Sequence, residues 1–359
     1  MNTHADLNKL AGATPRKVSG SRTDRTINLA LQGGGAHGAF TWGVLDRLLE
    51  EDKLSFEGVV ATSAGAMNAA VMAYGMAEGG RRGAQKALSN FWRRVSHAAA
   101  FSPLQPSLLD RLTGSRSLEH SPAFLVFDMV TRLMSPYQFN PMNFNPLKGV
   151  LEQSVDLDAI RMARCPVKLH ICATNVRTGK VKVFDNDELS IDAIMASACL
   201  PFLFQAVEID GEAYWDGGYM GNPALFPLFY NAAADDVLLV QLNPIERKQV
   251  PRTAQEIQDR MNEITFNATL LREFRAVEFV QRLVDQGLLP QDKYKRVRMH
   301  RIDADKALGA LGASTKMDSG YDFLLLLKQA GQRAARAWLK KHFDDLGVRE
   351  TLILRDEIA

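Results

Sequence analysis

Along this chain, short runs of apolar residues alternate with longer segments in which apolar and polar residues have helical spacing. Apolar runs typical of buried strands lie at 27–32 and 59–61. Each is followed by a segment in which apolar residues recur every three or four positions, at 35–51 and 64–77. Strands that alternate with helices in this way predict a largely parallel sheet.

The same two patterns continue to the end of the chain. They predict further strands at 167–173, 181–184, 207–209, 237–242 and 296–302. They predict further helices at 124–134, 190–199, 252–287 and 321–342. The sequence is therefore that of an α/β protein with a helical C-terminal part.

Composition limits the classes of protein that fit. A chain of 359 residues forms one large domain or two smaller ones, and 46% hydrophobic residues are enough for an ordinary globular core. A net charge of +2 argues against a nucleic-acid binder. Cys165, Cys172 and Cys199 are odd in number and lack zinc-site spacing, so we expect free thiols, no metal and a reducing, cytoplasmic compartment.

Two segments depart from the alternating pattern. Residues 1–26 are polar and basic with no apolar core of a secretory signal, so we expect a disordered tail, with a weak electrostatic membrane tether as the alternative. Residues 98–150 are rich in proline, phenylalanine, leucine and methionine. They are interpreted either as an irregular cap on the core or as a lid or groove wall for an acyl chain. No segment has the roughly 20 apolar residues that a membrane-spanning helix needs.

A glycine-rich turn directly follows the first predicted strand. Its glycines are Gly33, Gly34, Gly35 and Gly38. The spacing also fits the dinucleotide pattern G-x-G-x-x-G, but that use needs a carboxylate at the end of the second strand, where 61–63 reads Ala-Thr-Ser. The alternative use is an oxyanion hole, in which the N–H groups of Gly34 and Gly35 face a developing negative charge.

The second predicted strand runs into a serine. Ala61-Thr62-Ser63-Ala64-Gly65 resembles the nucleophile elbow G-x-S-x-G, with alanine in place of the first glycine. Small neighbours are needed there so that strand and helix can pass each other. A serine at this point could instead be only a helix N-cap.

An activating base for Ser63 has two candidate sources. A triad in the order serine, acid, histidine would need His300 or His342, and neither lies in a glycine-marked loop. Asp216 is followed by Gly217 and Gly218, so its carboxylate could approach another backbone closely. A desolvated aspartate has a raised pKa and can act as a general base, although Asp-Gly-Gly alone is more often a hairpin turn.

The three motifs, in this order over about residues 27–230, resemble the patatin-like phospholipases. The resemblance implies a three-layer α/β/α fold around a mostly parallel sheet, in a single large domain. It implies a Ser–Asp dyad with Ser63 as nucleophile and Asp216 as base, and an oxyanion loop at 33–38. The implied reaction is hydrolysis of fatty acyl esters in phospholipids or related lipids, without a cofactor.

These interpretations give an expected organisation of the chain. A catalytic domain at 27–230 follows the tail, and 231–359 is an α/β extension packed on the core. The expected partner is a lipid or other acyl ester, not nucleic acid; peripheral contact with the inner membrane surface and homo-oligomerisation are left open. A transacylase, a storage-polyester hydrolase and a non-catalytic acyl-lipid-binding module are the alternatives.

Overall fold

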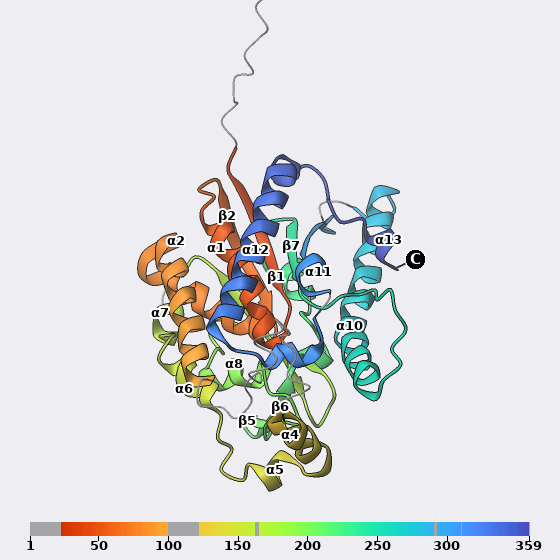
Figure 1. Cartoon of the computed structure of the whole chain (residues 1–359). Coiled ribbons are helices and arrows are strands. Elements are labelled where there is room, and N and C mark those ends of the chain that lie inside the picture. The colour runs from red at the N-terminus through yellow and green to blue at the C-terminus, as the bar shows by residue number, and fades with distance from the viewer. Residues whose placement is uncertain (1–22, 100–121, 162–164, 291–292, 310, 359) are drawn as a thin grey trace, which may run out of the picture.

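The computed structural model describes residues 23–99, 122–161, 165–290, 293–309 and 311–358. Most of the predicted 1–26 tail and the 100–121 part of the predicted cap lie outside these residues. The described residues form a single body in which helices surround a central sheet (Figure 1).

Eight strands form one sheet through the middle of the described chain. The strands are β1 (Arg25–Leu31), β2 (Leu54–Ala61), β3 (Lys168–Asn175), β4 (Val181–Phe184), β5 (Val207–Ile209), β6 (Glu212–Asp216), β7 (Asp236–Gln241) and β8 (Arg298–Asp303). Their order is β5-β6-β3-β2-β1-β7-β8, and β4 pairs with β3 off this path. Strands β3, β2, β1, β7 and β8 are parallel, whereas β4 and β6 run antiparallel to β3, and β5 antiparallel to β6.

Helices precede, connect and follow these strands. The longer ones are α1 (Gly38–Leu49), α2 (Ala64–Ala99), α4 (Pro122–Leu133), α10 (Ala254–Asp285) and α12 (Tyr321–His342). The shorter ones are α5 (Pro136–Phe139), α6 (Pro146–Glu152), α7 (Leu157–Arg161), α8 (Ile191–Ser197), α9 (Phe226–Asn231), α11 (Asp305–Leu308) and α13 (Leu354–Ile358). Short 3₁₀ helices are η1 (Gly35–His37), η2 (Gly217–Tyr219), η3 (Ala313–Met317) and η4 (Phe343–Asp345).

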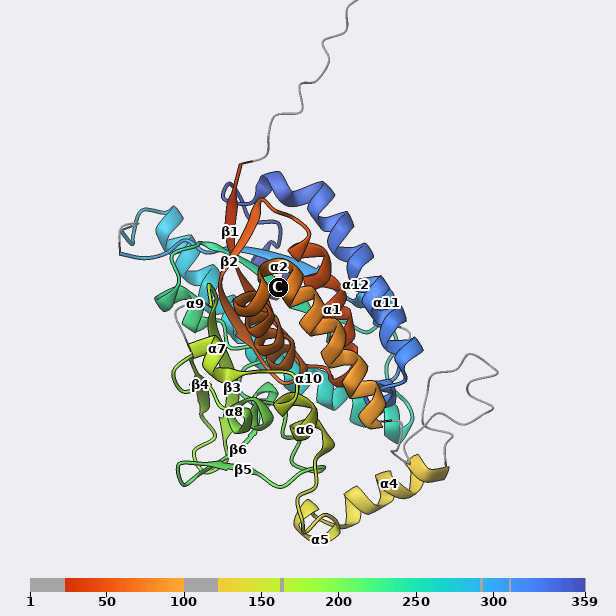
Figure 2. The same ribbon diagram turned by 90° about the vertical axis from the view of Figure 1, so that its left-hand side faces the viewer.

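The helices cover both faces of the sheet. Helices α1, α2 and α12 lie on one face, and α9, α10 and α13 lie on the other (Figures 1 and 2). Side chains alternate between the two faces along each strand: Leu29 and Leu31 of β1 pack with the first group of helices, and Ala30 packs with the second. The fold is therefore a three-layer α/β/α sandwich with a mostly parallel sheet, which confirms the predicted fold class.

The predicted elements match the observed ones most closely where the pattern is strongest. The strands at 181–184 and 207–209 and the helix at 321–342 have the predicted bounds. Helix α2 is longer than predicted and is interrupted at Gly79 and Gly80, whose backbone angles are not helical. The antiparallel direction of β4, β5 and β6 was not part of the prediction.

The chain after residue 230 supplies part of the same sheet. Strand β7 lies beside β1, and β8 lies at the outer edge next to β7. Helix α12 packs directly on α1. The two helices approach so closely that a Cβ on Gly331 would lie 2.0 Å from the carbonyl oxygen of Phe40. The predicted domain boundary at 230 stays a prediction, but the sheet itself continues across it.

Two further expectations concern the cysteines and the membrane. Cys165, Cys172 and Cys199 are free thiols, as predicted. Of the helices in the described ranges, none is both long enough and apolar enough to cross a bilayer.

Candidate active site

The glycine turn and the serine lie side by side at the carboxyl ends of two neighbouring strands. Leu31 at the end of β1 pairs with Ala61 at the end of β2. Two residues later on each strand, a Cβ on Gly33 would lie only 2.6 Å from the Cβ of Ser63. No side chain fits in that space, so glycine is required where the two segments meet.

Ser63 forms the turn between β2 and α2. Its φ is +56°, in the left-handed region that a residue with a side chain rarely occupies. The turn is held by neighbouring hydrogen bonds: the Ser63 N–H donates to Ser197 Oγ at 2.9 Å, and Thr62 Oγ1 donates to the Gly221 carbonyl at 2.6 Å. A positive φ at a serine between strand and helix is the backbone geometry of a nucleophile elbow.

Small residues around Ser63 allow the two helices to begin against the strands. A Cβ on Gly65 would lie 2.4 Å from the Leu31 carbonyl oxygen. A Cβ on Gly38, at the start of α1, would lie 2.7 Å from the Cβ of Ala64, at the start of α2. Ala61 is fully buried within β2, so its methyl group is accommodated where the motif has glycine.

Asp216 reaches the serine through the register of the sheet. Strand β3 extends past β2, because Ala61 pairs with Ile171 and β3 continues to Asn175. The antiparallel strand β6 pairs with that extension and places Asp216 opposite Ala173, two residues beyond Ile171. Ser63 is likewise two residues beyond Ala61, so the register brings serine and aspartate to the same level. Gly217 then passes so close to β3 that a Cβ there would lie 2.1 Å from the Cys172 carbonyl oxygen.

The Asp216 carboxylate is buried, and only one of its two oxygens has a hydrogen-bond partner among the described residues. Its Oδ1 accepts a hydrogen bond from the Gly218 N–H at 2.7 Å, whereas Oδ2 has no hydrogen-bond partner among the described residues. Burial raises the pKa of Asp216 to about 7, against smaller lowering effects of the Gly218 N–H and the nearby Ser63 hydroxyl. The vacant oxygen can therefore accept a proton near neutral pH.

The glycine turn, which meets Ser63 at Gly33, contains the candidate N–H groups for an oxyanion hole. Gly35 has a φ of +58°, and a Cβ there would lie 2.5 Å from the Lys316 carbonyl oxygen. The Gly33 N–H donates to Asn222 Oδ1 at 2.7 Å and is therefore not available to a substrate. The N–H groups of Gly34 and Gly35 make no hydrogen bond within the described ranges, and they remain the candidates for an oxyanion hole.

A buried carboxamide network, which the sequence analysis missed, holds this turn. Gln32 donates through Nε2 to the Asn222 carbonyl at 3.1 Å and to Asn267 Oδ1 at 3.3 Å. Asn243 Nδ2 donates to the Gly33 carbonyl at 2.8 Å. All four carboxamides are at most 3% exposed. A polar residue directly after a buried strand, as at Gln32 and Asn243, is the pattern that could have revealed them.

His37 lies in the glycine turn, but it is not a base for Ser63. The Thr315 hydroxyl donates to the Gly312 carbonyl, so it accepts from His37 Nε2 at 2.7 Å. Burial, followed by the nearby charges of Lys316 and Arg247, lowers the pKa of His37 to about 3. The imidazole is therefore neutral near pH 7, and its Nε2 is committed to Thr315.

The two histidines of the alternative triad are engaged elsewhere. His300 is fully buried, with Nε2 2.9 Å from Asp236 Oδ1 and Nδ1 2.9 Å from Thr351 Oγ1. His342 Nδ1 lies 2.8 Å from Asp345 Oδ2. Across the described part of the chain, no group of three histidine, cysteine or acidic side chains is arranged to hold a metal ion.

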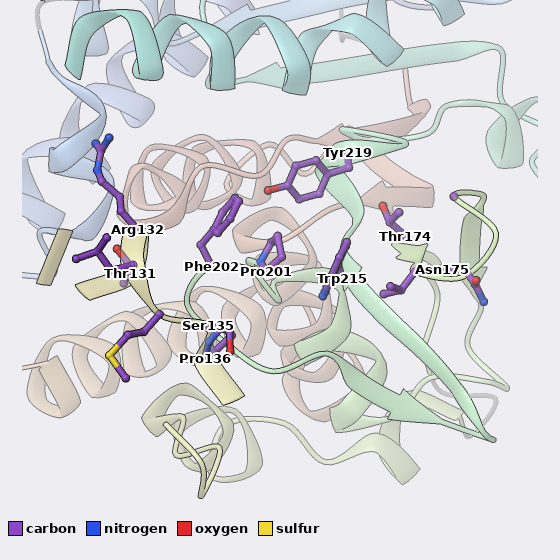
Figure 3. A pocket seen from close by; sticks show the side chains of 14 residues that line it. Thr131, Arg132, Ser135, Pro136, Thr174, Asn175, Pro201, Phe202, Trp215 and Tyr219 are labelled. Atoms are coloured by element: carbon purple, nitrogen blue, oxygen red, sulfur yellow. The ribbon is translucent and has the colours of Figure 1, made fainter. Parts of the chain in front are cut away.

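A mostly apolar cavity of about 630 Å³ is lined by residues that flank the Asp-Gly-Gly turn in the sequence (Figure 3). Its lining includes Trp215 and Tyr219, on either side of the Asp-Gly-Gly turn, together with Phe202. Residues 131–136, at the end of α4 and the start of α5, form another part of its wall. The described part of the predicted 98–150 cap therefore contributes to a cavity whose wall also includes the sequence neighbours of the Asp-Gly-Gly turn, although neither Ser63 nor Asp216 lines it.

Comparisons with known proteins agree with this geometry at the level of family. A family model described as patatin-like phospholipase matches residues 29–229. No curated protein sequence matches the chain.

Solved structures give only distant matches. VipD from Legionella pneumophila is 15% identical over 85% of this chain and 67% of VipD, with a TM-score of 0.37. The ExoU–SpcU complex from Pseudomonas aeruginosa gives 14% identity over 90% of this chain and 52% of the matched chain, also with a TM-score of 0.37. This chain thus spans about half the length of the latter.

The strained backbone at Ser63 leads to a prediction about stability. Glycine adopts a positive φ without steric cost, so Ser63→Gly should be more stable than Ser63→Ala by about 1 kcal/mol in the free energy of unfolding. Urea denaturation of both variants measures the difference. Equal stability, or a more stable alanine variant, would show that position 63 is not held at positive φ in solution.

Proposed function

The chain belongs to the patatin-like phospholipase family, and from this premise we propose that it is a serine acyl hydrolase that cleaves fatty acyl esters of phospholipids or related lipids with a Ser63–Asp216 dyad. One observation carries the proposal: a serine at positive φ lies at the same sheet level as a buried aspartate with a vacant carboxylate oxygen. The Gly34 and Gly35 N–H groups, which directly follow the Gly33 contact with that serine, are the proposed oxyanion-hole donors.

The first half of the proposed reaction forms an acyl-enzyme. Asp216 Oδ2 accepts the hydroxyl proton while Ser63 Oγ bonds to the ester carbonyl carbon. The carbonyl oxygen becomes an oxyanion, which the Gly34 and Gly35 N–H groups stabilise. When the carbon–oxygen bond of the ester breaks, Asp216 returns the proton to the departing alcohol.

The second half releases the fatty acid. A water molecule gives a proton to Asp216 and attacks the acyl carbon, and the same N–H groups stabilise the second oxyanion. The bond to Ser63 Oγ then breaks and the serine recovers its proton from Asp216. Both nucleophile activation and charge stabilisation are assigned to protein groups, so the proposal includes no cofactor.

The cavity lined by Trp215 and Tyr219 supports a lipid acyl chain as the bound group. Its volume of about 630 Å³ lies in the range of small-molecule pockets, and its wall includes the aromatic side chains of Phe202, Trp215 and Tyr219. A transacylase commonly pairs serine with histidine, and the engagement of His300 and His342 elsewhere favours a hydrolase. A storage polyester would use the same chemistry and differs only in the substrate.

The rim of this cavity supports peripheral contact with a lipid surface. Leu133 and Phe202 both line the cavity, and they are 75% and 68% exposed. Large apolar side chains exposed at the entrance of a cavity can insert into the boundary of a bilayer. We propose that the enzyme is cytoplasmic and meets the inner membrane surface through this rim.

Substitution of the dyad tests the proposed chemistry. Ser63→Ala and Asp216→Asn should each lower kcat by at least about a thousandfold, because nucleophile and base act as one unit. Fatty-acid release from p-nitrophenyl esters of increasing chain length and from a phospholipid panel measures this. The matched controls are Ser55→Ala, on the exposed side of β2, and Asp210→Asn, in the exposed β5–β6 turn.

Two results would contradict the proposal. Substantial turnover by Asp216→Asn would remove the aspartate from the role of base. A folded wild-type protein without activity on any ester would favour a non-catalytic acyl-binding module.

The raised pKa of Asp216 predicts a specific pH dependence. Only the ionised carboxylate accepts a proton, so kcat/KM on a soluble ester should rise with pH to a plateau, with a midpoint near its pKa of about 7. Stopped assays from pH 5 to pH 9 (about two units to either side) determine the midpoint. A kcat/KM that is already on its plateau at pH 5, as the ordinary aspartate pKa near 4 would give, would mean that a solvated carboxylate is the base.

Contact with a lipid surface is tested at the exposed rim. Leu133→Glu should lower turnover of phospholipid vesicles about tenfold while turnover of a soluble short-chain ester changes little, because a charge opposes insertion of the rim. Val348→Glu, at an exposed apolar position beyond the end of η4, is the control. If Leu133→Glu and the control affect vesicle turnover equally, the rim is not the contact surface.

A further inference from the structure

A short turn beyond the family match packs against the glycine turn of the active site. The 3₁₀ helix η3 lies at Ala313–Met317, whereas the match ends at residue 229. Its Lys316 carbonyl oxygen would be 2.5 Å from a Cβ on Gly35, and its Thr315 hydroxyl accepts the hydrogen bond from His37. The backbone of Gly35 and the side chain of His37 are thus in direct contact with this distant segment.

The side chain of Lys316 reaches the same turn through one carboxamide. Lys316 Nζ donates to Asn243 Oδ1 at 2.8 Å. The Nδ2 of the same Asn243 donates to the Gly33 carbonyl at 2.8 Å. Because the Gly33 carbonyl can only accept, Nδ2 of the carboxamide must face it, and Oδ1 faces the Lys316 amine. The chain of contacts leads from Lys316 through Asn243 to the residue beside Ser63.

We propose that Lys316 is a positioning residue of the acyl-transfer site. Through Asn243, and through the backbone of η3 against Gly35, it fixes the glycine turn so that the Gly34 and Gly35 N–H groups face the developing oxyanion. An oxyanion hole needs donors that are already oriented before the reaction. This inference rests on the proposed function, and it assigns part of the catalytic geometry to the chain beyond residue 230.

The charges around Lys316 give the proposal a second consequence. Glu263 and Asp259 of α10, Arg247 after β7, and Asp216 and His37 on the site side all interact with the amine. Burial lowers the pKa of Lys316, whereas the three carboxylates raise it and Arg247 lowers it. In return, the amine lowers the pKa of Asp216, although less than burial raises it. Loss of the amine should therefore raise the pKa of the base.

Labelling of Ser63 by a fluorophosphonate tests this role without a natural substrate. Ser63 Oγ bonds to phosphorus, fluoride leaves, Asp216 takes the hydroxyl proton, and the phosphoryl oxygen occupies the oxyanion position. Lys316→Met should label about ten- to a hundredfold more slowly than wild type, as expected for misplaced donors. The acidic limb of its rate profile should move to higher pH. Lys316→Arg should restore much of the rate, and Lys306→Met, at an exposed position on α11, should match wild type.

Hydrogen exchange of residues 33–38 provides a readout that does not depend on activity. These amides should exchange faster in Lys316→Met than in wild type and Lys306→Met. Equal exchange together with an unchanged labelling rate and pH profile would overturn the role of Lys316. If Lys316→Met does not fold, as judged by thermal denaturation, Lys316→Gln is assessed by the same criteria.

Failure of the proposed function gives a different result. Wild type labelled at Ser63 but inactive on every ester would refute the hydrolase, while the comparison of Lys316 variants would still stand. If Ser63 of the wild type does not react with the probe, the role of Lys316 is judged by amide hydrogen exchange of residues 33–38 alone. Equal exchange in wild type and Lys316→Met then overturns the inference.

Discussion

The approach between Gly33 and Ser63 is the contact on which the rest of the site depends. A Cβ on Gly33 would lie 2.6 Å from that of Ser63, so the turn after β1 and the elbow after β2 can meet only without a side chain. The approach brings the glycine turn, with the N–H groups of the proposed oxyanion hole, up to the serine. Ser63 has a positive φ at this contact, a strained conformation that the hydrogen bonds with Ser197 and of Thr62 support.

Such a turn has little rigidity of its own, because glycine restricts the backbone less than any other residue. The buried carboxamides supply the rigidity. Gln32, Asn222, Asn243 and Asn267 come from four different segments, and together they bind both sides of the glycine turn. When all its hydrogen bonds are made, a buried polar network of this kind holds the backbone in one conformation. Loss of one of these hydrogen bonds leaves a buried polar group unpaired, which destabilises the fold. The candidate active site is therefore assembled by segments far apart in the sequence, including the chain after residue 230.

Burial of Asp216 affects both the stability of the fold and the basicity of the carboxylate. An aspartate in the unfolded chain ionises near pH 4, whereas burial raises the pKa of Asp216 in the folded protein to about 7. Protons are thus held more tightly in the folded state, so the contribution of this group to stability falls as pH rises from about 4 to about 7. The same desolvation makes the carboxylate a base of suitable strength for a serine hydroxyl.

The sequence by itself determined the α/β class, most of the long elements and the three motifs around Gly33, Ser63 and Asp216, because strand and helix periodicity and strand-to-helix turns are local properties of the chain. It did not determine the antiparallel β6, whose register brings Asp216 level with Ser63. It also missed the carboxamide network and the contact of Lys316 with the glycine turn. Those features join residues up to about 280 positions apart, and only the pairing of strands and the packing of helices bring such residues together.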